Sequence, residues 1–352
     1  MRRMTREPSL ASRRPEPCEV CDSWEDCPER SPAASGRQGC FRPRRQLELE
    51  RVRAHFRGLR RAAALRGASL PAMEANLLAH FARAMRRYSD ILEFSFSARG
   101  RTASPYRFSY SFPAFGMGRA RAEAKACGTL VEPFGAGARR VADAVLALAR
   151  PPLVAQILFG LDAGRANLRL KLYLQFHEGM AREKLGLLSR SLPLPATRRL
   201  ADAPERLHLL GIDFRAGGVV GAKLYYLRSR VALAGLRRAF PRAGLFAHLA
   251  DRGRPAALDD VVLITRLGPG GEPDGPPVSE IDLGLRANGL GWDDVRGAFA
   301  RRAVGKAFDG FRRTALAGHR WTATRISFPV AGSSKLSVYY VLLDPPRRRE
   351  AR

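Results

Sequence analysis

Hydrophobic and polar residues alternate strictly over residues 168–176. The apolar set is Leu168, Leu170, Leu172, Leu174 and Phe176, and the polar set is Arg169, Lys171, Tyr173 and Gln175. A period of two predicts a β-strand with one apolar face and one polar face. The polar face carries two cations and a tyrosine in line, which a solvated surface does not require.

The same alternation recurs at 106–112, 219–227, 278–285 and 335–343. Basic residues recur at similar intervals in these segments, so Arg107, Lys171, Lys223 and Lys335 occupy equivalent positions. The interval before Lys335 is double the others, which predicts the unit at 278–285, where Glu280 and Asp282 are the polar residues. This pattern indicates five repeated units.

Each of these segments follows another alternating segment, at 91–97, 155–161, 207–214, 259–267 and 322–330. Short turns rich in Gly, Ala or Ser join most pairs, which predicts hairpins. Between the hairpins, apolar residues follow helical spacing. Three such stripes are Leu233, Leu236 and Phe240; Val141, Val145 and Leu148; and a longer one of Val295, Phe299, Phe308 and Phe311.

Strands of this kind occur in outer-membrane barrels and in closed sheets that helices coat around a polar lumen. The helices between the hairpins favour the second form. No secretory signal is apparent, and no run of about 18 apolar residues predicts a transmembrane helix. We therefore expect a cytoplasmic α+β protein whose residues 45–348 form a ten-stranded antiparallel β-barrel of five ββα(α) repeats coated by outer helices.

Residues 1–44 form a separate segment that is rich in Arg, Pro, Glu and Ser, and its composition predicts disorder. It holds four of the five cysteines, Cys18, Cys21, Cys27 and Cys40. Two cysteines spaced as Cys18 and Cys21 can bind one zinc ion, and two further thiolates would complete a tetrahedron. A metal site and a plain disordered extension both remain open for this segment.

The formal net charge is +28, from 61 Lys and Arg against 33 Asp and Glu. Only six of the 61 are lysines, and the chain is also rich in Ala, Gly and Pro, as expected from a GC-rich genome. Net charge is therefore a weak guide to partners, whereas a retained lysine is informative. Three of the six lysines occupy the repeated strand position described above.

Lysine presents a compact charge to a phosphate oxygen, and arginine binds such oxygens bidentately. The tyrosines further along the same strands, Tyr173, Tyr225 and Tyr339, would form a ring above the cations. Aromatic faces stabilise cations. A lumen that binds a diphosphate and surrounds the remaining carbon cation is suited to ionising an allylic diphosphate.

These segments resemble the ABBA-type aromatic prenyltransferases, and most of all the dimethylallyltryptophan synthase (indole prenyltransferase) family. The resemblance covers about residues 45–345 and rests on ILEFSFS followed by YRFSYSFP, on RLKLY and AKLYY, and on KLSVYY. It implies that Glu93 binds an indole N–H and that Arg107 binds diphosphate. It further implies diphosphate binding by Lys171 and Lys223, with Arg169, Arg325 and Lys335 as additional candidates, and cation shielding by Tyr173, Tyr225 and Tyr339.

The implied reaction transfers a dimethylallyl or longer prenyl group to an indole, a tryptophan-like compound or another electron-rich aromatic acceptor, as in alkaloid and other secondary metabolism. The expected partners are a prenyl diphosphate and a small aromatic molecule, with no nucleic acid and no membrane span. The aspartate-rich magnesium motif is absent from the sequence, since Asp259–Asp260 and Asp293–Asp294 are isolated pairs. We therefore expect no metal cofactor.

Three alternatives stay open at this stage. Glu280 and Asp282 depart from the family pattern, so the same barrel could bind an anionic ligand without turnover. The high charge is also compatible with a nucleic-acid-binding protein. Glu93 itself could form a structural ion pair with a neighbouring arginine.

Overall fold

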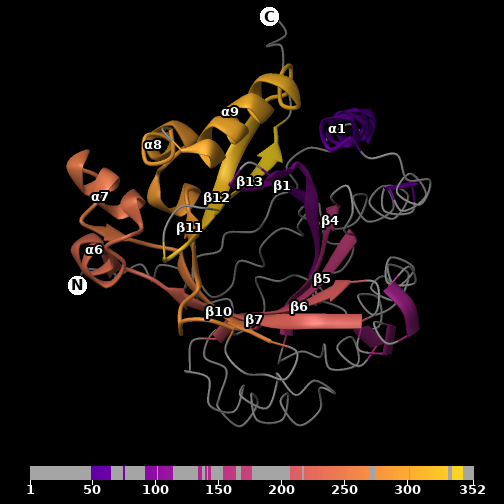
Figure 1. Cartoon of the computed structure of the whole chain (residues 1–352), viewed down its shortest axis with the longest axis horizontal. Coiled ribbons are helices and arrows are strands. Elements are labelled where there is room, and N and C mark those ends of the chain that lie inside the picture. Colours follow the sequence, from indigo (N-terminus) through magenta and orange to yellow (C-terminus); the bar gives the residue numbers. More distant parts are fainter. Residues whose placement is uncertain are drawn as a thin grey trace, which may run out of the picture.

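The computed structural model describes residues 49–64, 74–75, 92–100, 102–113, 134–136, 139–140, 142–143, 154–163, 168–176, 207–215, 218–268, 274–300, 302–331 and 335–343. Ten strands among them close into an antiparallel barrel, which Figure 1 shows as a ring around a central lumen. The predicted extension at 1–44, with its four cysteines, lies outside the described residues.

The barrel strands follow the chain as five hairpins, and pairing of the last strand with the first closes the sheet. They are β1 (Leu92–Arg99), β3 (Tyr106–Pro113), β4 (Val154–Ala163), β5 (Leu168–Phe176), β6 (Leu207–Arg215), β7 (Gly218–Arg228), β10 (Val261–Leu267), β11 (Glu280–Gly284), β12 (Trp321–Pro329) and β13 (Lys335–Leu342). All ten predicted strands are confirmed. A short strand that the sequence did not predict, β2 (Thr102–Ser104), extends the first hairpin beside β1. A second small sheet pairs β8 (Val231–Ala232) with β9 (Ala257–Leu258).

The strands place polar residues inward because each strand alternates with a period of two. In β5, Leu170, Leu172 and Leu174 are each 1% exposed on the outer face. On the inner face, Tyr173 pairs in register with Gly211 of β6, and Lys171 pairs with Asp213. A one-residue slip would move every cation of the strand into the apolar layer, so the pattern determines the register.

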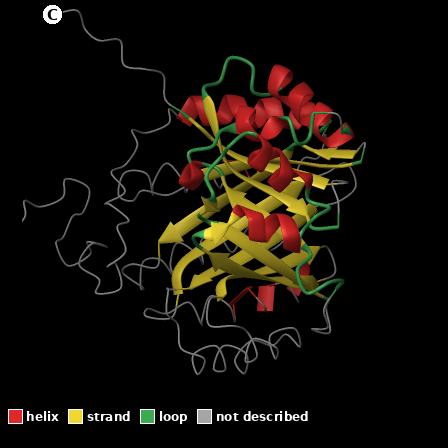
Figure 2. Ribbon diagram, turned by 90° about the vertical axis from the view of Figure 1, so that its left-hand side faces the viewer, coloured by secondary structure: helices red, strands yellow, loops and turns green. Residues whose placement is uncertain are grey.

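Helices cover the outer face of the sheet (Figures 1 and 2). They are α1 (Leu49–Ala62), α6 (Leu233–Ala239), α7 (Gly244–Asp251), α8 (Trp292–Arg296) and α9 (Ala303–Thr314), with a 3-10 turn η8 (Arg286–Asn288). Phe311 of α9 packs on Phe96 of β1 with ring centroids 4.8 Å apart, and Phe56 of α1 packs edge-on against Phe108 of β3. The apolar layer therefore lies between helices and sheet, and the lumen is left to polar side chains.

The helix predictions need one correction. The longer stripe from Val295 to Phe311 forms two helices, α8 and α9, because the chain turns between them and places Gly305 against the backbone carbonyl of Phe299. The stripe at Leu233 and Leu236 is confirmed in α6, which ends just before Phe240. The stripe of Val141, Val145 and Leu148 lies outside the described residues. In the described part of the chain, the helices are too short or too polar to cross a bilayer.

Candidate functional site

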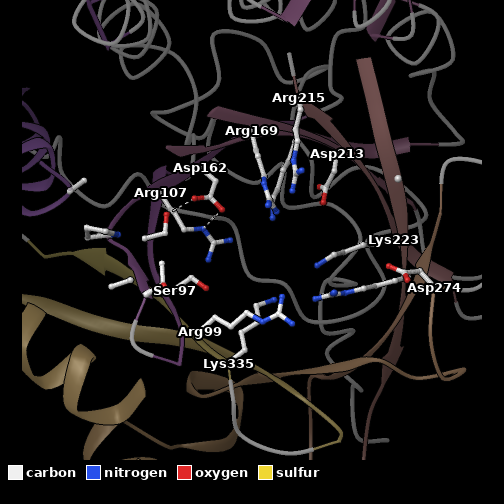
Figure 3. Close-up of a pocket in the computed structure, with 18 of the residues that line it drawn as sticks. Ser97, Arg99, Arg107, Asp162, Arg169, Asp213, Arg215, Lys223, Asp274 and Lys335 are labelled. Carbon is white, nitrogen blue, oxygen red and sulfur yellow. Dashed lines mark hydrogen bonds and ion pairs between the residues drawn. The ribbon is translucent and has the colours of Figure 1, made fainter. Parts of the chain in front are cut away.

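The larger of two adjoining cavities in the barrel has a volume of about 960 Å³ and is rich in cations. Its lining includes three carboxylates, Asp162, Asp213 and Asp274, and eight cations, Arg99, Arg107, Arg169, Lys171, Arg215, Lys223, Arg266 and Lys335. Figure 3 shows labelled cations converging on one space from β1, β3, β5, β6, β7 and β13. We call these eight residues the cation group. It contains five of the six residues predicted to bind diphosphate.

Arg107 is held rigidly at one side of this cavity. Its side chain is 8% exposed, its Nε lies 3.2 Å from Asp162 Oδ2, and its Nη1 donates to Ser337 Oγ at 3.2 Å. Asp162 also accepts a hydrogen bond from Ser104 Oγ at 2.6 Å. Burial tends to raise the pKa of Asp162, but Arg107 and Lys171 lower it below its usual range, so the carboxylate is ionised. The ion pair fixes the direction of the guanidinium.

Lys171 and Lys223 are held at high electrostatic cost, which a bound anion would relieve. Burial lowers the pKa of Lys171, although Asp213 opposes the shift. Burial and the neighbouring Lys171 lower the pKa of Lys223 to about 7. Two ammonium groups that repel each other in a desolvated cavity form a site that favours negative charge.

Glu280 of β11 is the internal counterion of the cation group. Its carboxylate is 3% exposed and lies 2.8 Å from Lys335 Nζ and 3.4 Å from Lys223 Nζ, and it also pairs with Arg266. In the sequence Glu280 is one of the two residues that depart from the family pattern. The structure instead places it where it binds three of the cations at once.

We expect Glu280→Gln to destabilise the unliganded protein by about 3 kcal/mol, because removing one partner of a buried ion pair leaves uncompensated charge. Inorganic pyrophosphate should restore much of this loss, so the ligand-induced rise in Tm should be larger in the variant than in the wild type. Thermal unfolding with and without pyrophosphate measures both effects. Asp274→Asn, which removes an exposed carboxylate of the same cavity, is the matched control and should behave like the wild type.

The smaller cavity, of about 190 Å³, contains the predicted acceptor and shielding residues. Glu93, Tyr173, Tyr225 and Tyr339 all line it. The rings of Tyr173 and Tyr225 meet edge-on, with centroids 6.0 Å apart and planes at 72°. Burial raises the pKa of all three phenols, so they remain neutral. The two cavities adjoin, since Arg107, Asp162 and Lys171 line both.

Glu93 points into the smaller cavity and accepts a hydrogen bond from Thr324 Oγ1 at 2.6 Å. Burial raises the pKa of Glu93, while the Thr324 hydrogen bond and the charge of Arg325 oppose the rise. Within the described ranges no cation forms an ion pair with this carboxylate. The alternative of a structural ion pair with a neighbouring arginine is therefore not realised there.

Arg325 occupies a different place from the one expected for a diphosphate ligand. It lines the smaller cavity rather than the larger one, and its Nη2 lies 2.6 and 2.7 Å from the two carboxylate oxygens of Asp260. An irregularity in the pairing of β12 with β13, between Ala323 and Arg325, shifts the register here. On its other side Arg325 pairs with Gly284 of β11, and Asp260 lies against that glycine. The position of Arg325 therefore does not support a role in diphosphate binding. It places Arg325 in the same cavity as Glu93.

Several lining residues were not predicted from the sequence because the repeated basic position lies on the second strand of each hairpin. Asp162, Asp213, Arg215 and Arg266 lie on first strands, and Arg99 lies at the end of β1. The alternation of the first strands could have identified them. Two glycines carried no such signal: Gly160 of β4 and Gly211 of β6 lie on either side of the Tyr173 ring, with which an added Cβ would come into contact.

We expect Gly211→Ala to displace Tyr173, because a Cβ at this position would lie 2.8 Å from Tyr173 Cε1 and 3.2 Å from Tyr225 Cε2. Overpacking of this kind costs about 1–3 kcal/mol. Turnover should fall in the variant, and thermal unfolding should report a modest loss of stability. Gly310→Ala, in α9 where nothing lies within 4 Å, is the control: it should leave turnover unchanged and should raise stability slightly, because alanine favours a helix interior over glycine. Wild-type kinetics in Gly211→Ala would argue against a role for the Tyr173 position.

Comparisons with known proteins find the same barrel. No family model matches the sequence, and no curated protein matches it. Among solved structures, the prenyltransferase PriB in ternary complex with L-tryptophan and dimethylallyl thiolodiphosphate is 15% identical, with a TM-score of 0.59 over 85% of this chain and 98% of that one. The 5-dimethylallyltryptophan synthase from Streptomyces coelicolor is 14% identical, with a TM-score of 0.56 over 82% and 95%.

A third similar structure is the 6-dimethylallyltryptophan synthase from Micromonospora olivasterospora in complex with DMASPP and Trp, which is 16% identical, with a TM-score of 0.54 over 84% of this chain and 97% of that one. These likenesses run through nearly the whole of each solved chain and agree with the closed antiparallel sheet and its outer helices. The chain therefore has the ABBA barrel fold of the aromatic prenyltransferases.

Proposed function

We propose that this protein transfers a prenyl group from an allylic diphosphate to an electron-rich aromatic acceptor. The observation that carries the proposal is the direct contact between two unlike cavities. One is lined by the cation group, and the other by Glu93 and three neutral tyrosines. A diphosphate in the first cavity would place its allylic carbon at the second.

In this proposal Arg107, Lys171 and Lys223 bind the diphosphate, assisted by Arg169 and Lys335. Cleavage of the carbon–oxygen bond leaves negative charge on the diphosphate and positive charge on the allylic carbons. Fixed cations that face the developing negative charge lower the barrier to this step. The faces of Tyr173, Tyr225 and Tyr339 stabilise the carbocation and exclude water from it.

The acceptor ring lies against Glu93 in this scheme. The carboxylate accepts the ring N–H, which raises the electron density of the ring and favours attack on the allylic cation. A new carbon–carbon bond forms, and the ring then loses the proton from the attacked carbon and regains its aromaticity. Proton transfer assisted by a positioned carboxylate is within the ordinary range of acid–base catalysis.

The diphosphate carries about three negative charges near neutral pH, and these require neutralisation as the bond breaks. We propose that side chains of this protein supply that charge and that no metal is needed. The similar solved structures support the donor and acceptor classes by what they bind: PriB holds L-tryptophan and a dimethylallyl thiolodiphosphate. A cytoplasmic setting within alkaloid or other secondary metabolism is part of the same proposal.

A mass-spectrometric screen tests the function. The full chain would be incubated with dimethylallyl or geranyl diphosphate and a set of indoles and phenols, and the expected result is an acceptor that gains one prenyl group. A protein that binds the diphosphate but forms no product with any acceptor would instead support the alternative of an anionic-ligand-binding barrel.

A further inference from the structure

Asp282 of β11 is a buried carboxylate that the scheme above does not use. The residue is 6% exposed and lines the smaller cavity together with Glu93. Its Oδ1 atom is buried and has no hydrogen-bond donor among the described residues. Ser327, its register partner on β12, donates to Glu280 Oε2 at 3.5 Å and lowers the pKa of Asp282. One oxygen of Asp282 thus remains without a donor among the described residues.

The cations that would neutralise Asp282 are already engaged. Arg325, Lys223 and Lys335 act on it electrostatically, but burial dominates and the pKa of Asp282 is raised. Arg325 forms its ion pair with Asp260, and both lysines form theirs with Glu280. No ion pair to Asp282 forms in the described part of the chain. A buried carboxylate with an unpaired oxygen is costly unless a ligand supplies the missing donor.

The remaining charges of the smaller cavity show what kind of ligand this is. Arg107 is paired with Asp162, and Lys171 lies beside Asp213 across the β5–β6 pairing. Lys171 is also one of the proposed diphosphate ligands, so an acceptor with its own carboxylate would compete for these two cations with Asp162 and with the diphosphate. An acceptor with a positive charge would find Asp282 available.

We propose that the acceptor is an aromatic compound with a side-chain ammonium group and no carboxylate, an arylalkylamine, and that Asp282 binds this ammonium. This inference rests on the proposed function and extends it. The ring N–H of the acceptor donates to Glu93, and the ammonium donates to the carboxylate of Asp282. Asp282 is thus a specificity-determining residue at the strand position where the sequence departs from the family pattern.

Equilibrium binding tests the assignment independently of turnover. Isothermal titration calorimetry in the presence of inorganic pyrophosphate would compare tryptamine, 3-ethylindole and L-tryptophan, which share the indole ring and differ in charge. We expect tryptamine to bind about ten- to a hundredfold more tightly than 3-ethylindole, as one charge-assisted hydrogen bond implies. L-Tryptophan should bind more weakly than tryptamine.

Asp282→Asn should abolish the preference, so that tryptamine and 3-ethylindole bind equally, and removal of the buried charge should leave the folded protein at least as stable. Asp282→Leu provides a second variant with the same expected loss of preference. Asp274→Asn, in the larger cavity, is the control and should retain the wild-type preference. Equal binding of the two ligands to the wild type, or an unchanged preference in both Asp282 variants, would overturn the proposal.

Prenyl transfer from dimethylallyl diphosphate, measured in the same preparations, separates this inference from the proposed function. Selective tryptamine binding that depends on Asp282 supports the ammonium site even if no product forms, in which case only the proposed reaction is wrong. Efficient prenylation of 3-ethylindole without any advantage for tryptamine would support the reaction and refute the ammonium site.

Discussion

Replacing Glu93 with Gln is expected to slow turnover of an indole acceptor by about 100-fold or more, because the substitution keeps the shape of the side chain and removes its charge. Diphosphate affinity should be nearly unchanged, since Glu93 lines only the smaller cavity. Steady-state kinetics with dimethylallyl diphosphate and an indole, together with pyrophosphate titration, measure the two quantities. An unaffected rate would show that the carboxylate has no part in the reaction.

The pH profile provides an independent test of the same carboxylate. Burial raises the pKa of Glu93, so the acidic limb of kcat/KM should lie at a higher pH than an exposed glutamate would give. Activity falls as the pH drops through this raised pKa, because the protonated acid no longer accepts the ring N–H. Thr324→Val removes a hydrogen bond that lowers the pKa, so it should move the limb to still higher pH. If the acidic limb lies at the same pH in the wild type and in Thr324→Val, Glu93 is not the group whose titration limits activity.

Replacing Lys171 or Lys223 with Gln is expected to weaken diphosphate binding by about ten- to a hundredfold in each case, which is the usual range for a charge-assisted hydrogen bond. The rate of ionisation should fall as well, and activity should survive EDTA. Titration with pyrophosphate and turnover assays with excess EDTA measure these effects. Activity that is lost in EDTA and restored by magnesium, with both variants behaving like the wild type, would refute a diphosphate site built from side chains alone.

The pH dependence of binding distinguishes Lys223 from its neighbours. Its pKa is lowered to about 7, so in the unliganded protein this amine loses its charge as the pH rises above that value. The contribution of Lys223 to pyrophosphate affinity should therefore be present below about pH 7 and should decline above it. Lys223→Arg keeps the charge at all these pH values and should show a weaker decline than the wild type. Parallel profiles for the two proteins would contradict a lowered lysine pKa.

Most of the barrel could be predicted because strand alternation is a local property. A period of two in β5 separates Lys171 from Leu172 whatever the rest of the chain does, and the same reasoning identified all ten strands. The helical segments between the hairpins then indicated a helix-coated closed sheet whose polar faces share one lumen. The longer helical stripe was misread as continuous because apolar spacing reports which face is buried and carries little information about where a helix ends.

Two features of the site depended on contacts that no local pattern encodes. The slot for Tyr173 arises from Gly211 on the neighbouring strand, and it becomes visible only when the pairing of β5 with β6 places the two residues side by side. The placement of Arg325 depends on its pairing with Gly284 of β11, which brings a cation predicted for diphosphate beside Asp260 and Glu93. The sequence around Gly211 or Arg325 does not reveal which side chains of neighbouring strands will contact these residues.

The sequence by itself determined which side chains face the lumen, because inward and outward positions follow directly from the alternation. Only the tertiary structure decided which of those side chains meet. Glu280 reaches Lys223, Arg266 and Lys335 because β11 lies between β10 and β12 in the sheet, with β7 next to β10 and β13 next to β12. Strand tilt and stagger determine which residues of different strands lie at the same height along the axis of a closed barrel, and both are properties of the whole sheet. Closure of the sheet between β13 and β1 also leaves Asp282 near Glu93, and among the described residues no cation forms an ion pair with Asp282.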